Sequence, residues 1–189
     1  LILSHCYILI DDLEPAKIYL DAAKKINSDI PSIGWNEARL LLKQNKVNEA
    51  LALAYKTNKL FPDDIEGMAV LGSCLRASSR FDESLEYLNK AINIDPKYAE
   101  ALINRGLIYL NKRDKANALN DLEKAYYLKP HIKQIWNLIL NLKIEGNEYE
   151  NAISIAEEMV KLDPVNEKTF AAIAICYQKL KNYDQTVVF

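Results

Sequence analysis

Apolar residues recur at three- and four-residue spacing along the chain, which is the pattern of amphipathic α-helices. Residues 99–132 illustrate it with two series: Leu102, Gly106 and Tyr109, then Ala118, Leu122 and Ala125. Strand-like alternation is nowhere sustained. Short polar connections such as 111–114 and 145–148 separate the series, and we expect Gly146 to take the left-handed conformation that ends a helix. The pattern therefore predicts an all-α chain of paired helices.

The helical series repeat with a period of 34 residues. Four prolines mark this period: Pro62, Pro96, Pro130 and Pro164. Proline lacks a backbone N–H and disfavours helix in the residue before it, so it should end the second helix of each row. One column of the same register is small, which permits close helix crossing: Ala16, Ala50, Ser84, Ala118, Ala152 and Thr186. We predict one array with repeats at 31–64, 65–98, 99–132 and 133–166, and partial repeats at 1–30 and 167–189.

The third and fourth rows carry the residues on which a family resemblance rests. The third reads Met68-x2-Leu71-Gly72-x2-Leu75, and the fourth reads Leu102-x2-Arg105-Gly106-x2-Tyr109. With its small column, its period and its prolines, the whole chain resembles the tetratricopeptide repeat. The resemblance implies a right-handed superhelical solenoid of antiparallel helix pairs. Because the chain starts and stops inside repeats, we expect it to be a fragment of a longer array.

Charge and hydropathy exclude several kinds of partner. The net charge is −2, and both signs are spread along the sequence without a run of five like charges. This argues against a nucleic-acid partner or a polybasic membrane anchor. The longest apolar stretch, residues 1–10, is too short to span a bilayer. We therefore expect neither nucleic acid nor membrane as a partner.

The three cysteines, Cys6, Cys74 and Cys176, occupy one column of the repeat. Successive repeats of packed helices lie about 10 Å apart, whereas the Cα atoms of a disulfide must lie within about 7 Å. Cysteines two or three repeats apart should therefore be unpaired, buried and small-hydrophobic in role. Free thiols favour a reducing compartment, so we expect a cytoplasmic protein.

Motifs for catalysis or for cofactor binding are absent from the sequence. His5 and His131 are far apart and lack metal-ligand spacing, and there is no phosphate-binding, dinucleotide-binding or nucleophile-elbow motif. The acidic pairs at 11–12 and 63–64 lie at helix junctions, where carboxylates cap helix N-termini. We predict no catalytic residue, no metal and no cofactor, and hence no enzyme.

The resemblance implies that the first helix of each pair lines a concave groove. Carried onto this sequence, the groove-facing residues are Trp35, Asn36, Arg39, Lys43, Val70, Ser73, Arg76, Ile103, Asn104, Leu107, Asn111, Asn137, Leu138 and Asn141. We predict a protein-interaction scaffold that holds a peptide or a partner helix, with Trp35 and Arg39 as anchors. Arg39, Lys43 and Arg76 are candidates to bind an acidic segment. The carboxylate clamp of chaperone-binding arrays is not reproduced.

Asparagines give the groove a second feature. Asn36 and Asn104 share a column, and Asn137 and Asn141 follow in the next repeat. Such amides can pair with a peptide backbone, and the arrangement resembles the asparagine ladder in O-linked N-acetylglucosamine transferases. The alternative is asparagines that only face solvent.

Two further expectations concern the context of the array. The alternative function is a substrate-recruiting arm of a larger enzyme, such as a glycosyltransferase, whose catalytic domain lies outside this chain. The terminal repeats carry apolar ends without polar caps, at residues 1–3 and 187–189. We expect self-association through them.

Overall fold

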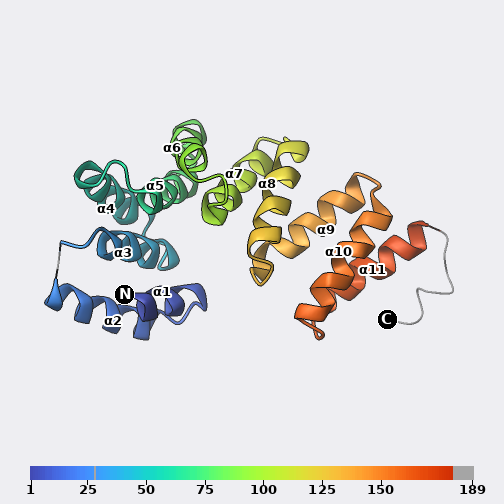
Figure 1. Cartoon of the computed structure of the whole chain (residues 1–189), viewed down its shortest axis with the longest axis horizontal. Coiled ribbons are helices and arrows are strands. Elements are labelled where there is room, and N and C mark those ends of the chain that lie inside the picture. The colour runs from blue at the N-terminus through green and yellow to red at the C-terminus, as the bar shows by residue number, and fades with distance from the viewer. Residues whose placement is uncertain (28, 181–189) are drawn as a thin grey trace. The chain divides into compact units, whose positions relative to one another are not determined.

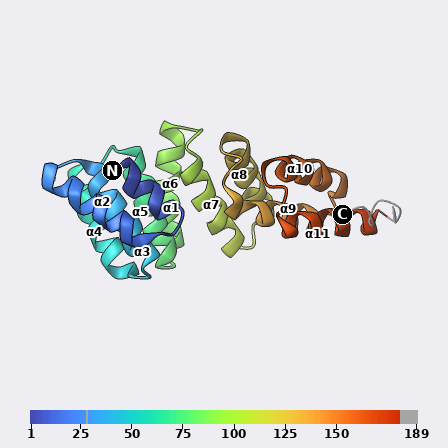
Figure 2. The ribbon, with the colours of Figure 1, turned by 90° about the horizontal axis from the view of Figure 1, so that it is seen from below.

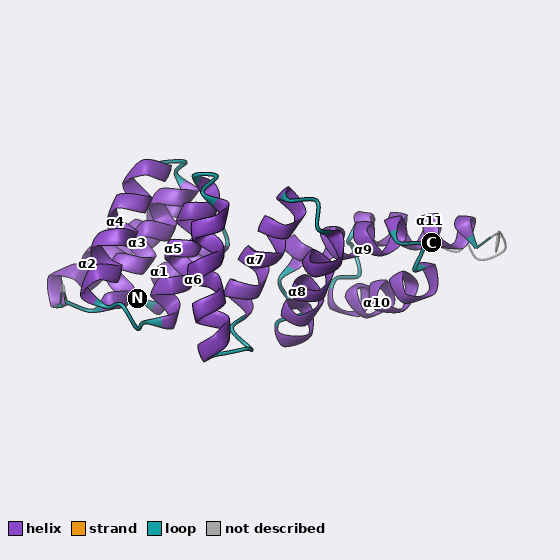
Figure 3. Ribbon diagram, turned by 90° about the horizontal axis from the view of Figure 1, so that it is seen from above, coloured by secondary structure: helices purple, strands orange, loops and turns teal. Residues whose placement is uncertain are grey.

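The structure is a computed structural model that describes residues 1–27 and 29–180. The described residues form eleven α-helices and one 3-10 turn without a strand (Figure 3). The elements are α1 Ile2–Leu9, α2 Leu13–Ile26, α3 Pro31–Lys43, α4 Val47–Leu60, α5 Ile65–Ala77, α6 Phe81–Ile94, α7 Ala99–Asn111, α8 Lys115–Leu128, η1 Lys133–Ile135, α9 Trp136–Glu145, α10 Tyr149–Leu162 and α11 Glu167–Lys179. The prediction of an all-α chain of paired helices is confirmed.

The chain divides into two compact units, Leu1–Ile108 and Tyr109–Phe189. In unit 1, helices α1 and α2, α3 and α4, and α5 and α6 pack as pairs, and α3 and α5 each pack on the pair before them (Figure 1). In unit 2, α9 packs against α8, α10 and α11, and α10 packs against α11 (Figure 2). Within each unit, the first helix of a pair therefore joins successive repeats.

The turns between first and second helices share one unusual residue. Five residues have φ between 60° and 65°: Asp11, Asn45, Ser79, Arg113 and Asn147. They are spaced by one repeat, so the register of the turn is as regular as that of the helices. Gly146 has a φ of −79°, so the prediction that it adopts the left-handed conformation is wrong. Asn147 adopts it instead, since a short polar side chain tolerates this region.

The second helices end where the prolines predict. Helices α4, α6, α8 and α10 each end two residues before a proline, at Leu60, Ile94, Leu128 and Leu162. The capping prediction is confirmed for Asp64, whose carboxylate accepts a hydrogen bond from the Gly67 backbone N–H at 3.2 Å. It is wrong for Asp12, which precedes α2 without a side-chain cap.

Small residues lie where first and second helices cross. The described members of the small column are buried: Ala16, Ala50, Ser84, Ala118 and Ala152, while Thr186 lies outside the described residues. The Ser84 hydroxyl donates to the Gly72 carbonyl at 2.6 Å. A Cβ on Gly72 would lie 2.6 Å from Leu88 Cδ2, so a larger residue here would displace the Leu88 side chain. Close approach at a fixed register therefore explains the column.

The cysteines follow their column except at the first repeat. Cys74 and Cys176 are buried as predicted, but Cys6 is exposed, because no described helix covers that side of α1. All three are free thiols. Burial raises the pKa of the Cys74 thiol to about 12, which keeps it protonated at neutral pH. Cys74 therefore acts as a small buried side chain.

Candidate functional site

The predicted interaction surface comes from the first helices α3, α5, α7 and α9. Its fourteen residues fall into three classes of exposure. Fully or nearly buried are Trp35, Asn36, Arg39, Val70 and Asn104. Partly exposed are Ser73, Arg76, Ile103, Leu107, Asn137 and Leu138, and exposed are Lys43, Asn111 and Asn141. The surface available to a partner is therefore narrower than the sequence predicts.

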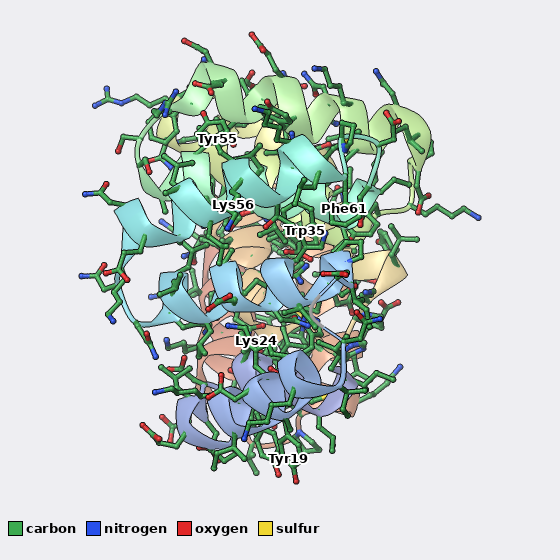
Figure 4. All side chains as sticks on the ribbon, turned by 90° about the vertical axis from the view of Figure 1, so that its left-hand side faces the viewer. Tyr19, Lys24, Trp35, Tyr55, Lys56 and Phe61 are labelled. Atoms are coloured by element: carbon green, nitrogen blue, oxygen red, sulfur yellow. The ribbon has the colours of Figure 1, made fainter. Side chains whose placement is uncertain are left out.

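Trp35 belongs to the core of unit 1. Its side chain is 0% exposed, and its Nε1–H donates to Asp64 Oδ2 at 3.1 Å. A Cβ on Gly67 would lie 2.3 Å from the indole ring, so the ring packs directly on the α5 backbone. Figure 4 shows Trp35 among the side chains between the helices, whereas Tyr19 lies at the outer edge. The prediction that Trp35 contacts a partner is therefore wrong, and the same holds for Val70, which is also 0% exposed.

Arg39 is saturated by two carboxylates of the same unit. Its Nη1 donates to Glu66 Oε1 at 2.6 Å, and its Nη2 and Nε donate to the Glu100 carboxylate at 2.7 and 3.3 Å. Although burial lowers the pKa of the guanidinium, Glu100 and Glu66 together raise it above its ordinary value. Arg39 is therefore not available to an acidic partner, and it links α3, α5 and α7 instead.

The carboxylates of this network come from one column of the repeat. Ser32, Glu66 and Glu100 are spaced by 34 residues, and the Ser32 hydroxyl donates to Glu66 Oε2 at 3.1 Å. The resemblance places these three residues on the same groove-facing stripe as Arg39, but their pairing with it was not predicted. An acidic column on the same face as Arg39 was the signal that could have revealed this pairing.

The asparagines of unit 1 are engaged within the protein. Asn36 Oδ1 lies 3.1 Å from the His5 ring nitrogen Nδ1. Asn104 Oδ1 accepts from Arg76 Nε at 3.1 Å, and its Nδ2 donates to the Glu100 carbonyl at 3.0 Å. Both asparagines are less than 7% exposed. The predicted asparagine ladder is therefore wrong for unit 1, because neighbouring side chains cover and bond these amides.

The two remaining basic residues of this face differ. Lys43 is exposed and pairs with Asp11 at 3.1 Å. Arg76 is partly buried, and among the residues that the structure describes it has the Asn104 bond but no carboxylate partner. Burial lowers the pKa of its guanidinium. Arg76 is thus a desolvated cation without a counter-charge in the described chain.

In unit 2, the predicted interaction surface borders a shallow hollow of about 470 Å³. The hollow brings together the predicted residues Leu138 and Asn141 with others: Leu110, Arg113, Lys115, Leu142 and Glu145. Lys115 and Glu145 pair at 2.8 Å at its edge. Three leucines with an amide and charged groups can hold an apolar side chain of a partner and bond its backbone.

Unit 2 also contains a buried cation, Lys143, away from the hollow. Its Nζ lies 2.6 Å from Glu123 Oε1 on α8 and 3.2 Å from Glu148 Oε2, which precedes α10. Burial lowers the pKa of this ammonium, but the bonds and charges of Glu123 and Glu148 outweigh burial and raise it. Lys143 therefore holds helices together where the repeat usually has a large apolar residue.

Among residues 1–27 and 29–180, no group of three or more His, Cys, Asp or Glu residues is arranged to hold a metal ion. None of the helices at residues 2–179 is both long and apolar enough to cross a bilayer.

Two family models match the chain. One described as "TPR repeat" matches residues 72–112, and one described as "Tetratricopeptide repeat" matches residues 99–132 and 133–166. The latter two segments have the same bounds as two rows of the sequence pattern. Together the two models match residues 72–166, which run from within α5 to the end of the repeat that contains α10.

Similar proteins include two glycosyltransferases. The chain is 30% identical over 112 residues to a UDP-N-acetylglucosamine–peptide N-acetylglucosaminyltransferase of Giardia intestinalis. It is 26% identical over 155 residues to a probable enzyme of the same kind, SPINDLY, of Hordeum vulgare. The matches cover 54% and 78% of this chain but 8% and 16% of those proteins. The chain thus spans less than a fifth of either relative.

A solved structure with a similar fold is that of a thermophilic TPR protein of Thermus thermophilus. It has a TM-score of 0.73 and 21% identity, and the match covers 93% of this chain and 96% of that one. At this identity the likeness shows the fold, which is the helical solenoid expected from the period of 34.

Proposed function

The chain belongs to the tetratricopeptide repeat family, and from this premise we propose that it is a protein-interaction scaffold that binds a peptide or a partner helix on its first helices. The observation that carries the proposal is the hollow of unit 2, where Leu138 and Asn141 remain accessible beside Leu110 and Leu142. An apolar anchor with hydrogen-bonding groups around it is the usual chemistry of peptide recognition.

The partner we propose is protein rather than nucleic acid or membrane. The net charge is −2, and on unit 1's first helices Arg39 and Lys43 are already paired with carboxylates. A phosphate backbone is bound by concentrated, unpaired basic side chains. We propose no catalytic residue and no cofactor, and a cytoplasmic location remains a prediction from the free thiols.

The alternative is a recruiting arm of a larger glycosyltransferase. It rests on two relatives of which the chain matches 8% and 16%. Matches this partial are those expected of shared repeats, so this alternative is not favoured.

Selection of peptides on the whole chain tests the proposal. Peptides displayed on phage are selected against the protein, and their affinities are measured for two hollow variants, Leu138→Asp and Asn141→Trp. Each should weaken binding at least tenfold, because one charges the apolar floor and the other fills the hollow. Asn141 is exposed, so its variant should remain folded.

The matched control is Leu162→Asp, which charges an exposed leucine at the end of α10. It should leave affinity unchanged. Unaltered affinity in both hollow variants would overturn the proposed site, and failure to select any peptide would overturn the proposed function.

Self-association through the first repeat remains a prediction. Leu3 is 52% exposed, whereas its equivalents Leu71 and Ile139 are fully buried. Residues 187–189, the other end named in the prediction, lie outside the described residues. Sedimentation velocity checks it: Leu3→Glu should shift the protein towards monomer, and a monomeric parent chain would rule it out.

A further inference from the structure

The guanidinium groups of Arg39 and Arg76 lie on the same set of first helices but have opposite surroundings. Arg39 donates three hydrogen bonds to two carboxylates. Arg76 donates one, from Nε to Asn104, and no carboxylate among the described residues pairs with it. A charge removed from water is ordinarily compensated by a counter-charge, because desolvation without one is costly. Arg76 therefore lacks a partner of the kind that Arg39 has.

Asn104 fixes the direction in which Arg76 can bind. Its Nδ2 donates to the Glu100 carbonyl at 3.0 Å, which turns Oδ1 towards Arg76 Nε. Since Nε is used, the edge formed by Nη1 and Nη2 remains for a ligand. Two parallel N–H donors on this edge match the two oxygens of a carboxylate. Arg76 lies in the last turn of α5, where the helix dipole favours any cation. The hydrogen bond to Asn104 explains in addition why its guanidinium is held against α7.

We propose that Arg76, oriented by Asn104, is a binding site for a carboxylate group of the protein partner. The inference rests on the proposed function and adds the chemistry of one anchor in unit 1. The partner supplies an aspartate or glutamate side chain, or a chain-terminal carboxylate, that pairs with Nη1 and Nη2. Burial lowers the pKa of Arg76 in the free protein, which agrees with a desolvated cation that has no counter-charge among the described residues.

The test follows the arginine side chains directly by NMR. The whole chain is labelled with ¹⁵N-arginine, and the Nε–Hε signals are recorded while three tripeptides are added separately. These are acetyl-Leu-Glu-Leu-amide, acetyl-Leu-Gln-Leu-amide and acetyl-Leu-Gln-Leu with a free C-terminal carboxylate. We expect the Arg76 signal to shift and saturate with a carboxylate probe and not with the capped Gln probe. Comparison of the first and third probes distinguishes a side-chain carboxylate from a terminal one.

Other arginines of unit 1 provide internal controls. The Arg39 signal should stay in place, because its donors are occupied by Glu66 and Glu100. Arg80 pairs with Glu83 at the exposed start of α6 and reports non-specific binding. Equal shifts at Arg80 and Arg76, or no saturable shift at Arg76, would overturn the inference.

Two variants keep the result interpretable. Asn104→Asp places a carboxylate beside Arg76 within the protein, so it should abolish probe binding while the fold is retained. Among the peptides selected on the whole chain, those with acidic sequences should bind Arg76→Gln at least tenfold more weakly, whereas their affinity for Arg80→Gln should be unchanged. If Arg76→Gln has no effect while Leu138→Asp does, this inference is wrong and the proposed function stands. If neither has an effect on the selected peptides, Arg76 and Leu138 both fail as binding residues.

Discussion

Each unit contains a buried cation held by two carboxylates, but the two are placed differently. Arg39 of unit 1 lies on the predicted interaction surface, and its partners on α5 and α7 are 27 and 61 residues away. Lys143 of unit 2 pairs with Glu123 on α8 and with Glu148, only five residues away at the start of α10. Arg39 therefore joins three successive repeats, whereas Lys143 joins α9 to α8 of the preceding repeat and to the nearby turn before α10.

This difference decides what each unit offers a partner. In unit 1, the donors of Arg39 are engaged by Glu66 and Glu100, so the guanidinium of the predicted surface that remains for a ligand is that of Arg76. In unit 2, the cation lies away from the hollow, and Leu138 and Asn141 stay accessible. Under the two proposals, the repeats of unit 1 therefore offer a charged anchor and those of unit 2 an apolar one.

The largest effect is expected from Arg39→Met. Removal of the guanidinium takes three charge-assisted hydrogen bonds from Glu66 and Glu100 and leaves both carboxylates without their counter-charge, so the free energy of unfolding should fall by about 3 kcal/mol. Urea denaturation measures it. Asn141→Ala, in the same column of unit 2, is the control and should change it by less than about 0.5 kcal/mol. Equal losses in Arg39→Met and Asn141→Ala would contradict the difference between a buried, paired Arg39 in unit 1 and an exposed Asn141 in unit 2.

The packing columns should show no such difference between units. Ala50 in unit 1 and Ala118 in unit 2 are both 0% exposed at helix crossings. Ala50→Leu and Ala118→Leu should each overpack the crossing and lower the free energy of unfolding by about 1–3 kcal/mol. Thermal unfolding measures both. An unchanged melting temperature in either variant would refute the assignment of that crossing.

A smaller loss is expected from Lys143→Met. Glu148 is 43% exposed and keeps the hydrogen bond from Asn151 once the ammonium is gone, so the loss should be about 1 kcal/mol. Urea denaturation at pH 7 measures it. A loss as large as that of Arg39→Met would contradict the distinction between a cation that joins three repeats and one that joins two.

The smallest effect is expected on how the free energy of unfolding depends on pH under acidic conditions. The pKa of Glu148 is lowered by the Asn151 amide and then by Lys143, so its contribution is present above its ordinary pKa of 4.5 and is lost as pH falls through the lowered value. In Lys143→Met the Asn151 bond remains, so the dependence of unfolding free energy on pH below 4.5 should shrink but persist. Urea titrations between pH 3 and 5 measure it, and an unchanged slope would exclude Lys143 as a cause.

Sequence reasoning succeeded where a repeat imposes local constraints. The helix ends follow from proline, and the buried small column follows from close crossing, so both were predictable. It failed at single residues whose environment depends on neighbouring repeats. Trp35 was predicted to be an exposed anchor, yet Gly67 on the next repeat lets its ring reach the core. Cys6 was predicted to be buried like Cys74, yet it is exposed.

The sequence by itself determined the all-α class, the period of 34 residues and the register of the described helix pairs, because proline, small residues and apolar spacing act within a few residues of chain. The tertiary structure decided which side chains of the first helices remain accessible. Arg39 and Arg76 are indistinguishable as arginines on one predicted face. Only packing places Glu66 and Glu100 within hydrogen-bonding distance of Arg39 and an amide beside Arg76. Electrostatic pairing depends on distance in space, which the one-dimensional pattern does not contain.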